Sequence, residues 1–160
     1  MIRHIRHIRT ALCVLVLAFL EQNAQAGVTA NKELNFGEFI VKNNDAVHSI
    51  TVNISGPSYT YDTAGFIVIN DANIQNGDYD IDSLPPNTNI ASVTVTQITP
   101  LSGPSGPNFQ MNTFQVSHSN RTSPAGVARV RVGATAQTSG TGTAYVDQTY
   151  TGTLQIQINF

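Results

Sequence analysis

Residues 150 to 160 read Y-T-G-T-L-Q-I-Q-I-N-F, and no other stretch constrains the structure of this chain as tightly. Successive side chains of an extended strand point to opposite faces, so one face here carries the aromatic and aliphatic residues Tyr150, Leu154, Ile156, Ile158 and Phe160. The other face is Thr, Gln and Asn, which predicts a half-buried β-strand. The stretch has neither charge nor proline, the usual protections of a free sheet edge, so we expect another strand to cover it.

Seven further segments are short, largely apolar and extended: Leu34 to Val41, Val47 to Ile54, Gly65 to Asn70, Asp78 to Ser83, Ile90 to Ile98, Phe109 to Ser117 and Val127 to Ala134. Clusters of Gly, Pro, Asn, Asp and Ser separate them, as turns require. No segment after residue 26 has helical periodicity. About eight strands punctuated in this way predict an all-β fold, an antiparallel β-sandwich, in one domain over residues 27–160.

The apolar alternation also predicts which side chains form the core of this sandwich. We expect the following to be mostly buried: Phe36, Phe66, Val68, Phe114, Val130, Val132, Leu154, Ile156 and Ile158.

The N-terminal residues 1–26 have the three parts of a secretory signal peptide. Arg3, Arg6 and Arg9 precede the ten-residue apolar run Ala11 to Leu20, and Ala24-Gln25-Ala26 fits a small-x-small cleavage site. A membrane anchor is the alternative, but ten residues are about half the length that spans a bilayer. We therefore expect export to the periplasm and then to the cell surface or the extracellular space.

Charge and cysteine content limit the functions open to residues 27–160. Cleavage of the expected signal peptide would remove three arginines and Glu21. Residues 27–160 then hold five basic and nine acidic residues, a net charge of −4, which disfavours nucleic acid and anionic membranes as partners. The only cysteine, Cys13, lies in the apolar run, so no disulfide is expected. No later apolar run is long enough to insert into a membrane.

Six short motifs resemble, in order, those of a secreted bacterial pilin-like family, the domain of unknown function 4402. This family is similar to spore coat protein U and to the fimbrial subunits of chaperone–usher pili. The motifs are Leu34-Asn35-Phe36-Gly37, Ala64 to Val68, Tyr79 to Pro85, Phe109 to Phe114, Arg131 to Thr135 and Tyr150 to Thr153. Together they cover essentially all of residues 27–160.

The resemblance implies an immunoglobulin-like sandwich that lacks its final strand and exposes a groove beside the C-terminal strand. A periplasmic chaperone would fill the groove first, and the N-terminal segment of another pilin-like subunit would then replace it by strand addition. The groove residues implied are Tyr150, Leu154, Ile156, Ile158 and Phe160.

The expected donor segment is short. Gly27 to Glu33 offers only Val28 and Ala30 as alternating apolar residues before Leu34. Three readings stay open: donation by the segment through Phe36, acceptance of a strand without donation, or a sandwich complete in itself.

Catalysis and metal binding have little support in the sequence. His48 and His118 are about seventy residues apart, and G-x-S-x-G does not occur. His48 fits a hydrogen-bonded core or edge histidine, and His118 lies in a polar turn. Asp78, Asp80 and Asp82 on one strand face could hold calcium, but such a row more often keeps a sheet edge soluble.

We therefore expect a non-enzymatic, secreted structural subunit of a fimbria or surface coat, with no cofactor. The alternative is a stand-alone sandwich that binds carbohydrate or a surface partner. A subunit should assemble by strand exchange, whereas a binding module should be monomeric. A hydrolase is disfavoured by the residue inventory.

Overall fold

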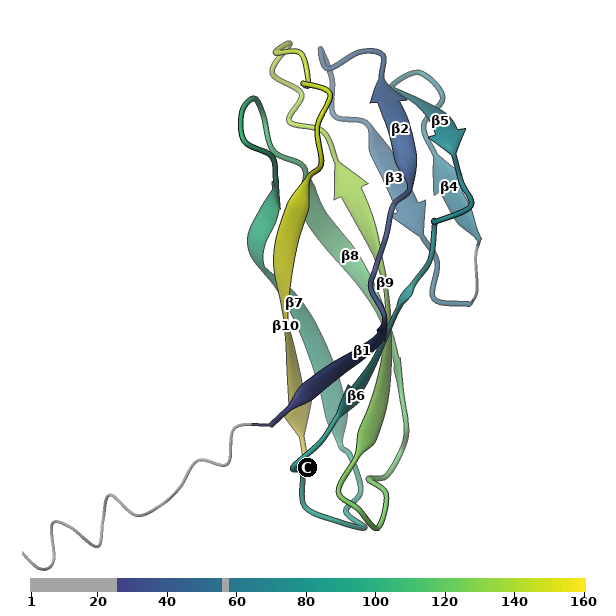
Figure 1. The fold of residues 1–160 in the computed structure, drawn as a ribbon, viewed down its shortest axis with the longest axis vertical. Coiled ribbons are helices and arrows are strands. Elements are labelled where there is room, and N and C mark those ends of the chain that lie inside the picture. The colour runs from purple at the N-terminus through teal and green to yellow at the C-terminus, as the bar shows by residue number, and fades with distance from the viewer. Residues whose placement is uncertain (1–25, 56–57) are drawn as a thin grey trace, which may run out of the picture.

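The computed structural model describes residues 26–55 and 58–160, an all-β domain in which every strand pairing is antiparallel (Figure 1). These residues contain no helix, and so none long and apolar enough to cross a membrane. The expected signal peptide lies outside them, apart from Ala26. The strands are β1 Val28–Lys32, β2 Glu38–Val41, β3 Ser49–Val52, β4 Tyr59–Tyr61, β5 Phe66–Asn70, β6 Gly77–Ile81, β7 Ser92–Ser102, β8 Gln110–His118, β9 Ala128–Gln137 and β10 Thr151–Asn159.

The first layer of the sandwich is built around β9. Strand β8 pairs along one edge of β9, while β3 and β6 pair one after the other along its second edge. Strand β4 continues this layer beyond β3, and β1 continues it beyond β6. Val130, Val132, Ala134 and Ala136 of β9 are all fully buried, as a central strand requires.

The second layer consists of two separate strand pairs, β7–β10 and β2–β5. In Figure 1 the β7–β10 pair stands on the left and the β2–β5 pair on the upper right, with β8 and β9 behind them. The two pairs are not hydrogen-bonded to one another in the described part of the chain. This layer is therefore divided, unlike the continuous layer behind it.

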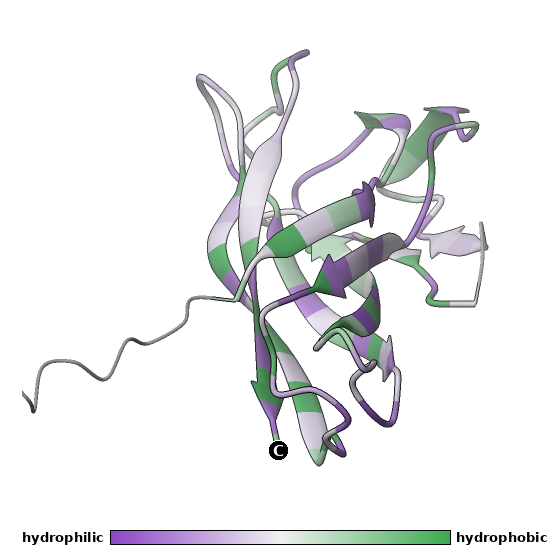
Figure 2. Ribbon diagram, turned by 60° about the horizontal axis from the view of Figure 1, so that its bottom comes forward, coloured by the Kyte–Doolittle hydropathy of each residue, from purple (hydrophilic) through white to green (hydrophobic). Residues whose placement is uncertain are grey.

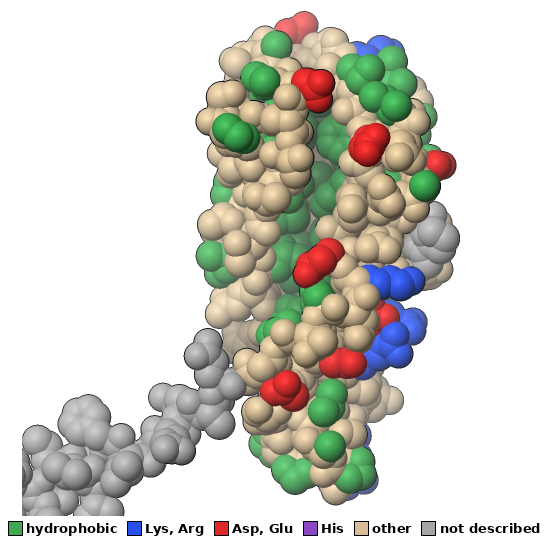
Figure 3. Space-filling view, viewed as in Figure 1, with side chains coloured by type: hydrophobic (Ala, Val, Ile, Leu, Met, Phe, Trp, Pro, Cys, Tyr) green, Lys and Arg blue, Asp and Glu red, His purple; other side chains and the backbone are tan. Residues whose placement is uncertain are grey.

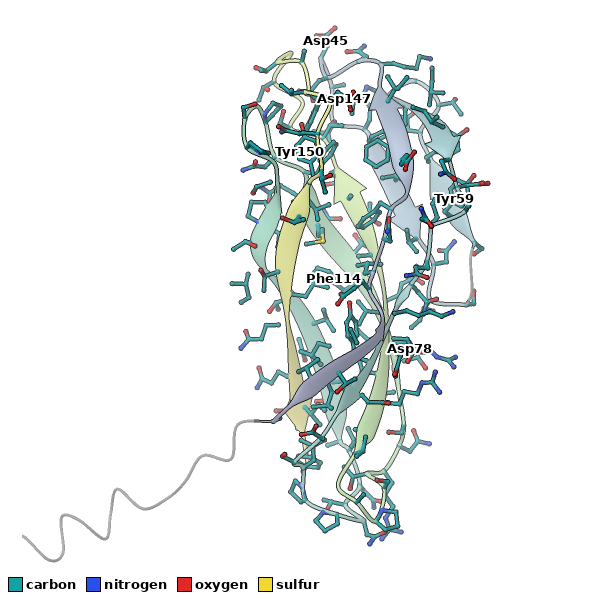
Figure 4. All side chains as sticks on the ribbon, in the orientation of Figure 1. Asp45, Tyr59, Asp78, Phe114, Asp147 and Tyr150 are labelled. Carbon is teal, nitrogen blue, oxygen red and sulfur yellow. The ribbon has the colours of Figure 1, made fainter. Side chains whose placement is uncertain are left out.

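The core between the layers has two clusters that share one aromatic side chain. The upper cluster includes Ile50, Phe66 and Phe109, and the lower one includes Val130 and Val132. Phe114 packs against both, and Figure 4 shows it between β10 and the first layer. Hydrophobic and hydrophilic residues alternate along several strands, as expected where only one face is buried (Figure 2).

A bulge in β8 aims Phe114 into the core. The register of β8 against β9 shifts between Asn112 and Gln115, and Thr113 has a φ of 49°. Strict alternation from the buried Met111 would turn Thr113 inward, whereas the extra residue turns Phe114 and Val116 inward instead. A positive φ is unfavourable for a β-branched residue, so the packing of Phe114 compensates a strained backbone.

Several strand boundaries differ from the sequence prediction: β7 runs on to Ser102, past the predicted Ile98, and β9 to Gln137, past the predicted Ala134. The expected strand Leu34 to Val41 is shorter in the structure, because Gly37 has a φ of 77° and β2 begins only at Glu38. Strands β1 and β4 were not predicted, since β1 is largely polar and β4 has only three residues, too few to show a period; they pair with β6 and β3. Sequence periodicity detects strands with a buried face and misses such edges.

All nine predicted core residues are buried or partly buried. Phe36, Phe66, Val130 and Val132 are buried. The other five are only half-buried: Val68, Phe114, Leu154, Ile156 and Ile158. The three β10 residues among them belong to the second layer, which is divided into two strand pairs.

The acidic row on β6 is paired within the fold. Asp78 is buried and receives two hydrogen bonds from the Arg129 guanidinium, 2.7 Å from Nε and 2.5 Å from Nη2. Asp80 accepts from the Asn31 amide, and Asp82 accepts from the Gly27 backbone N–H. Residues 26–55 and 58–160 contain no group of three acidic, His or Cys side chains able to hold a metal ion.

The Asp78–Arg129 pair makes stability depend on acid pH. The Arg129 hydrogen bonds hold the pKa of Asp78 below its ordinary value, so the native state favours the ionised carboxylate. This contribution is present above the unfolded-state pKa, about 3.9, and is lost as pH falls through it towards the lower native pKa. We predict that the free energy of unfolding of Asp78→Asn falls less between pH 5 and pH 3 than that of the parent chain.

Denaturant titrations at several pH values measure how steeply the free energy of unfolding falls with pH, which is the slope to compare. Asp45→Asn is the control for net charge, because Asp45 is exposed and forms no ion pair among the residues described. Equal slopes for the parent chain and Asp78→Asn would show that the pair does not contribute.

Candidate functional site

Two strand edges on either side of the division in the second layer have no strand partner. In the described residues β10 pairs only with β7, and β2 pairs only with β5. The free edges of β10 and β2 lie on the two sides of the division in the layer (Figure 1). Each presents backbone N–H and C=O groups that a further strand could pair.

An apolar groove of about 1130 Å³ occupies the space between these edges. Figure 3 shows it as a long hollow with hydrophobic side chains along its floor. Residues of β2 and the segment before it form one wall, and residues of β10 and the preceding loop form the other. The volume exceeds the roughly 300–1,000 Å³ of small-molecule pockets, and the elongated form suits an extended chain.

The predicted groove residues fall into two groups. Tyr150, Leu154 and Ile156 line the groove, and all three are half-buried. Ile158 packs against the lower core cluster instead, while Phe160 lies beyond the end of β10 with 50% of its surface exposed. The structure thus brings together the first three residues of the predicted set.

Two of the three predicted donor residues line the same groove. Val28 and Leu34 line it, whereas Ala30 is in register with Tyr79 of β6. Strand β1 is held in its own chain by pairing with β6 and is exposed along its length. Donation of this segment to another chain stays a prediction.

The wall before β2 is fixed by polar contacts to the β5–β6 connection. The Leu34 N–H donates to the Tyr79 hydroxyl, and Asn35 and Gln75 exchange two backbone hydrogen bonds. Gly37 turns the chain into β2, where a Cβ would lie 2.5 Å from Ile74 and the φ is left-handed. These contacts give the Leu34 to Gly37 motif its physical role.

An aromatic cluster closes the upper end of the groove. Phe109 stacks on Tyr145 with ring centroids 4.1 Å apart, and it meets Tyr150 edge-on at 5.0 Å and Phe39 edge-on at 5.6 Å. The Tyr150 hydroxyl donates to the Val146 carbonyl. Figure 4 shows Tyr150 at this end of β10. The cluster links β2 to the segment just before β10 at this end of the groove.

Sequence reasoning missed several residues of the groove. Phe39, Met111, Tyr79 and Tyr145 line it, and Tyr145 lies in a loop that carries no strand pattern. Burial raises the pKa of Tyr79, the hydrogen bond from the Leu34 N–H partly opposes this, and the negative charge of Glu33 adds to the increase. The alternation of Phe39 and Val41 in β2 was the one available signal.

The histidines lie away from the groove lining. His48 is 8% exposed and its Nδ1 lies 2.6 Å from Asp62 Oδ2, which confirms a hydrogen-bonded core histidine. The hydrogen bond from His48 lowers the pKa of Asp62. His118 Nδ1 lies 2.9 Å from the Ser119 carbonyl oxygen. Neither histidine is among the residues that line the groove.

Fold and site define an all-β sandwich domain with an open apolar groove between two free strand edges. Residues 27–160 match the family described as a domain of unknown function (DUF4402), and the chain belongs to this family. No curated protein and no solved structure matches the chain. The relation to fimbrial and spore coat proteins therefore stays a prediction.

The open groove predicts that an Ile→Ala substitution lowers the free energy of unfolding much less beside the groove than in the closed core. Ile50 is fully buried, so Ile50→Ala should lower the free energy of unfolding by about 2–5 kcal/mol. Ile156 faces the groove and is only half-buried, so Ile156→Ala should cost well under half as much in the isolated chain. Urea titrations of both variants measure the difference. Equal losses would mean that the Ile156 site is already closed.

Proposed function

We propose that the protein is an exported structural subunit of a fimbria or surface coat, and that a strand from another chain completes its second layer. The observation that carries this proposal is the pair of free strand edges on either side of one apolar groove. A single inserted strand would satisfy both edges and turn the second layer into the sheet β5-β2-strand-β10-β7.

The energetics favour a strand over other occupants. An extended segment adds main-chain hydrogen bonds at the edges and sends alternate side chains into the groove. Each fully buried aliphatic or aromatic side chain contributes roughly 1.5–3 kcal/mol. Strands β2 and β10 run in opposite directions in Figure 1, so the inserted strand would be parallel to one and antiparallel to the other. A small molecule could not pair both edges along their length.

The family resemblance supports particular partners for this strand. It implies a periplasmic chaperone as the first occupant and another pilin-like subunit as the second. The signal-peptide pattern in residues 1–26 agrees with assembly outside the cytoplasm. The groove lining contains no His, Cys, Ser or Lys among the described residues, so we assign the groove to binding and not to catalysis.

A strand supplied within the same chain tests the proposal. We predict that a two-residue Asn-Gly turn and nine alternating apolar and polar residues, fused after Phe160, will raise the melting temperature by several degrees. The fused strand would fold back as an antiparallel hairpin on β10 and fill the groove. Calorimetry of the chain with and without the extension measures this.

Two lysine substitutions on β10 provide matched specificity controls. Ile156→Lys places a charge in the groove, where an unpaired buried charge costs several kcal/mol, and should abolish the gain from the extension. Gln157→Lys, on the exposed opposite face, should preserve it. A stand-alone binding module, complete in itself, would show no gain from the extension in any background.

A further inference from the structure

The charged residues along the groove all have the same sign. Glu33 and Glu38 lie on the β2 side, and Asp147 lies in the loop before β10. All three are exposed, and the described lining contains no Lys, Arg or His. Figure 3 shows acidic side chains beside the hollow and basic ones gathered away from it, while Figure 4 places Asp147 near its Tyr150 end. We call Glu33, Glu38 and Asp147 the acidic rim.

The acidic rim has no counter-charge in the fold as described. The ion pairs of residues 26–55 and 58–160 are His48–Asp62, Arg129–Asp78 and Arg131–Asp78, and none includes a rim carboxylate. Asp78, by contrast, is neutralised by its arginines. The two sets of carboxylates therefore differ: one is satisfied within the sheet, and the other surrounds an unfilled apolar groove.

We infer that the occupant of the groove is an extended segment of a different protein with apolar side chains on one face and Lys or Arg on the other. This inference rests on the proposed function. The apolar face would fill the groove, while the aliphatic stems of Lys and Arg would lie along its edges and their charged ends would meet the acidic rim. The carboxylates on both walls of the groove would then attract the inserted strand, because its side chains carry the opposite charge.

Electrostatic complementarity of this kind acts mainly on partner choice and association rate. Exposed ion pairs contribute little individually, so the affinity comes from the strand and the selectivity from the charges. Like charges brought together across an interface disfavour an acidic strand. The net charge of −4 over residues 27–160 adds to the attraction of a basic partner.

The chain's own N-terminal segment fits this description poorly. Gly27 to Leu34 carries one basic residue, Lys32, next to an acidic one, Glu33. Its first residues are also paired with β6, and Glu33 itself belongs to the acidic rim. A second copy of this chain is therefore a weaker donor than a lysine- or arginine-bearing strand of another protein.

Three synthetic nine-residue peptides test the inference on the full chain. The same apolar residues occupy four alternating positions in all three peptides, and the other five positions are all Lys, all Gln or all Glu. We expect the Lys peptide to bind at least about tenfold more tightly than the Glu peptide at low salt, measured by fluorescence anisotropy. High salt should reduce this ratio while leaving the Gln peptide nearly unaffected.

Two triple variants separate the acidic rim from net charge. Glu33→Gln/Glu38→Gln/Asp147→Asn should bring the Lys and Glu peptides to similar affinities and should leave binding of the Gln peptide intact. Asp45→Asn/Asp71→Asn/Asp80→Asn removes the same number of carboxylates outside the groove lining and should preserve the preference. Circular dichroism confirms that both variants remain folded.

The outcomes distinguish this inference from the function on which it rests. Equal binding of the Lys and Glu peptides, or loss of the preference in the control variant, would overturn the basic-strand inference and leave strand acceptance standing. Failure of all three peptides to bind, the uncharged one included, would contradict strand acceptance itself.

Discussion

The structure depends on one constraint, the need of strand backbones to find hydrogen-bond partners. A β-strand whose outer edge lies beside apolar side chains leaves N–H and C=O groups that neither the core nor bulk water satisfies well. Strands β10 and β2 both have such an edge in the described part of the chain, and they lie on the same groove. The wall anchored at Leu34 to Gly37 and the aromatic cluster around Phe109 keep the two edges apart. One inserted strand would pair with both of these edges.

The open groove also explains how the core is distributed. The first layer surrounds β9 on both edges, and the inward side chains of β9 are fully buried. The alternating residues of β10 face inward too, yet Leu154, Ile156 and Ile158 are only partly buried, in a layer that is divided into two strand pairs. A domain with a margin of about 5–15 kcal/mol gains substantially when such side chains become covered. Folding and assembly would then share one apolar surface, and the acidic rim would select which strand completes it.

The sequence predicted the features that depend on a buried face and missed those that depend on tertiary pairing. Two-residue alternation identified β10 and the sandwich, because a strand with one buried face shows its period directly. It also selected Tyr150, Leu154 and Ile156, which do line the groove. It could not find β1, which is largely polar, or β4, which has only three residues. Nor could it find the inward turn of Phe114, which a bulge creates. The groove wall supplied by Tyr145 comes from a loop with no periodic signal, and the opposition of β2 to β10 requires the complete fold.

Amide hydrogen exchange along β2, β9 and β10 tests the central claim, that the second layer lacks a strand which another chain can supply. In the isolated chain, we expect the groove-facing amides of β10 and β2 to exchange much faster than the amides of β9, since they have no hydrogen-bond partner. A bound strand should slow exchange at those amides and leave β9 unchanged. Protection of β10 and β2 equal to that of β9 in the isolated monomer, with no change when a strand is added, would contradict the account.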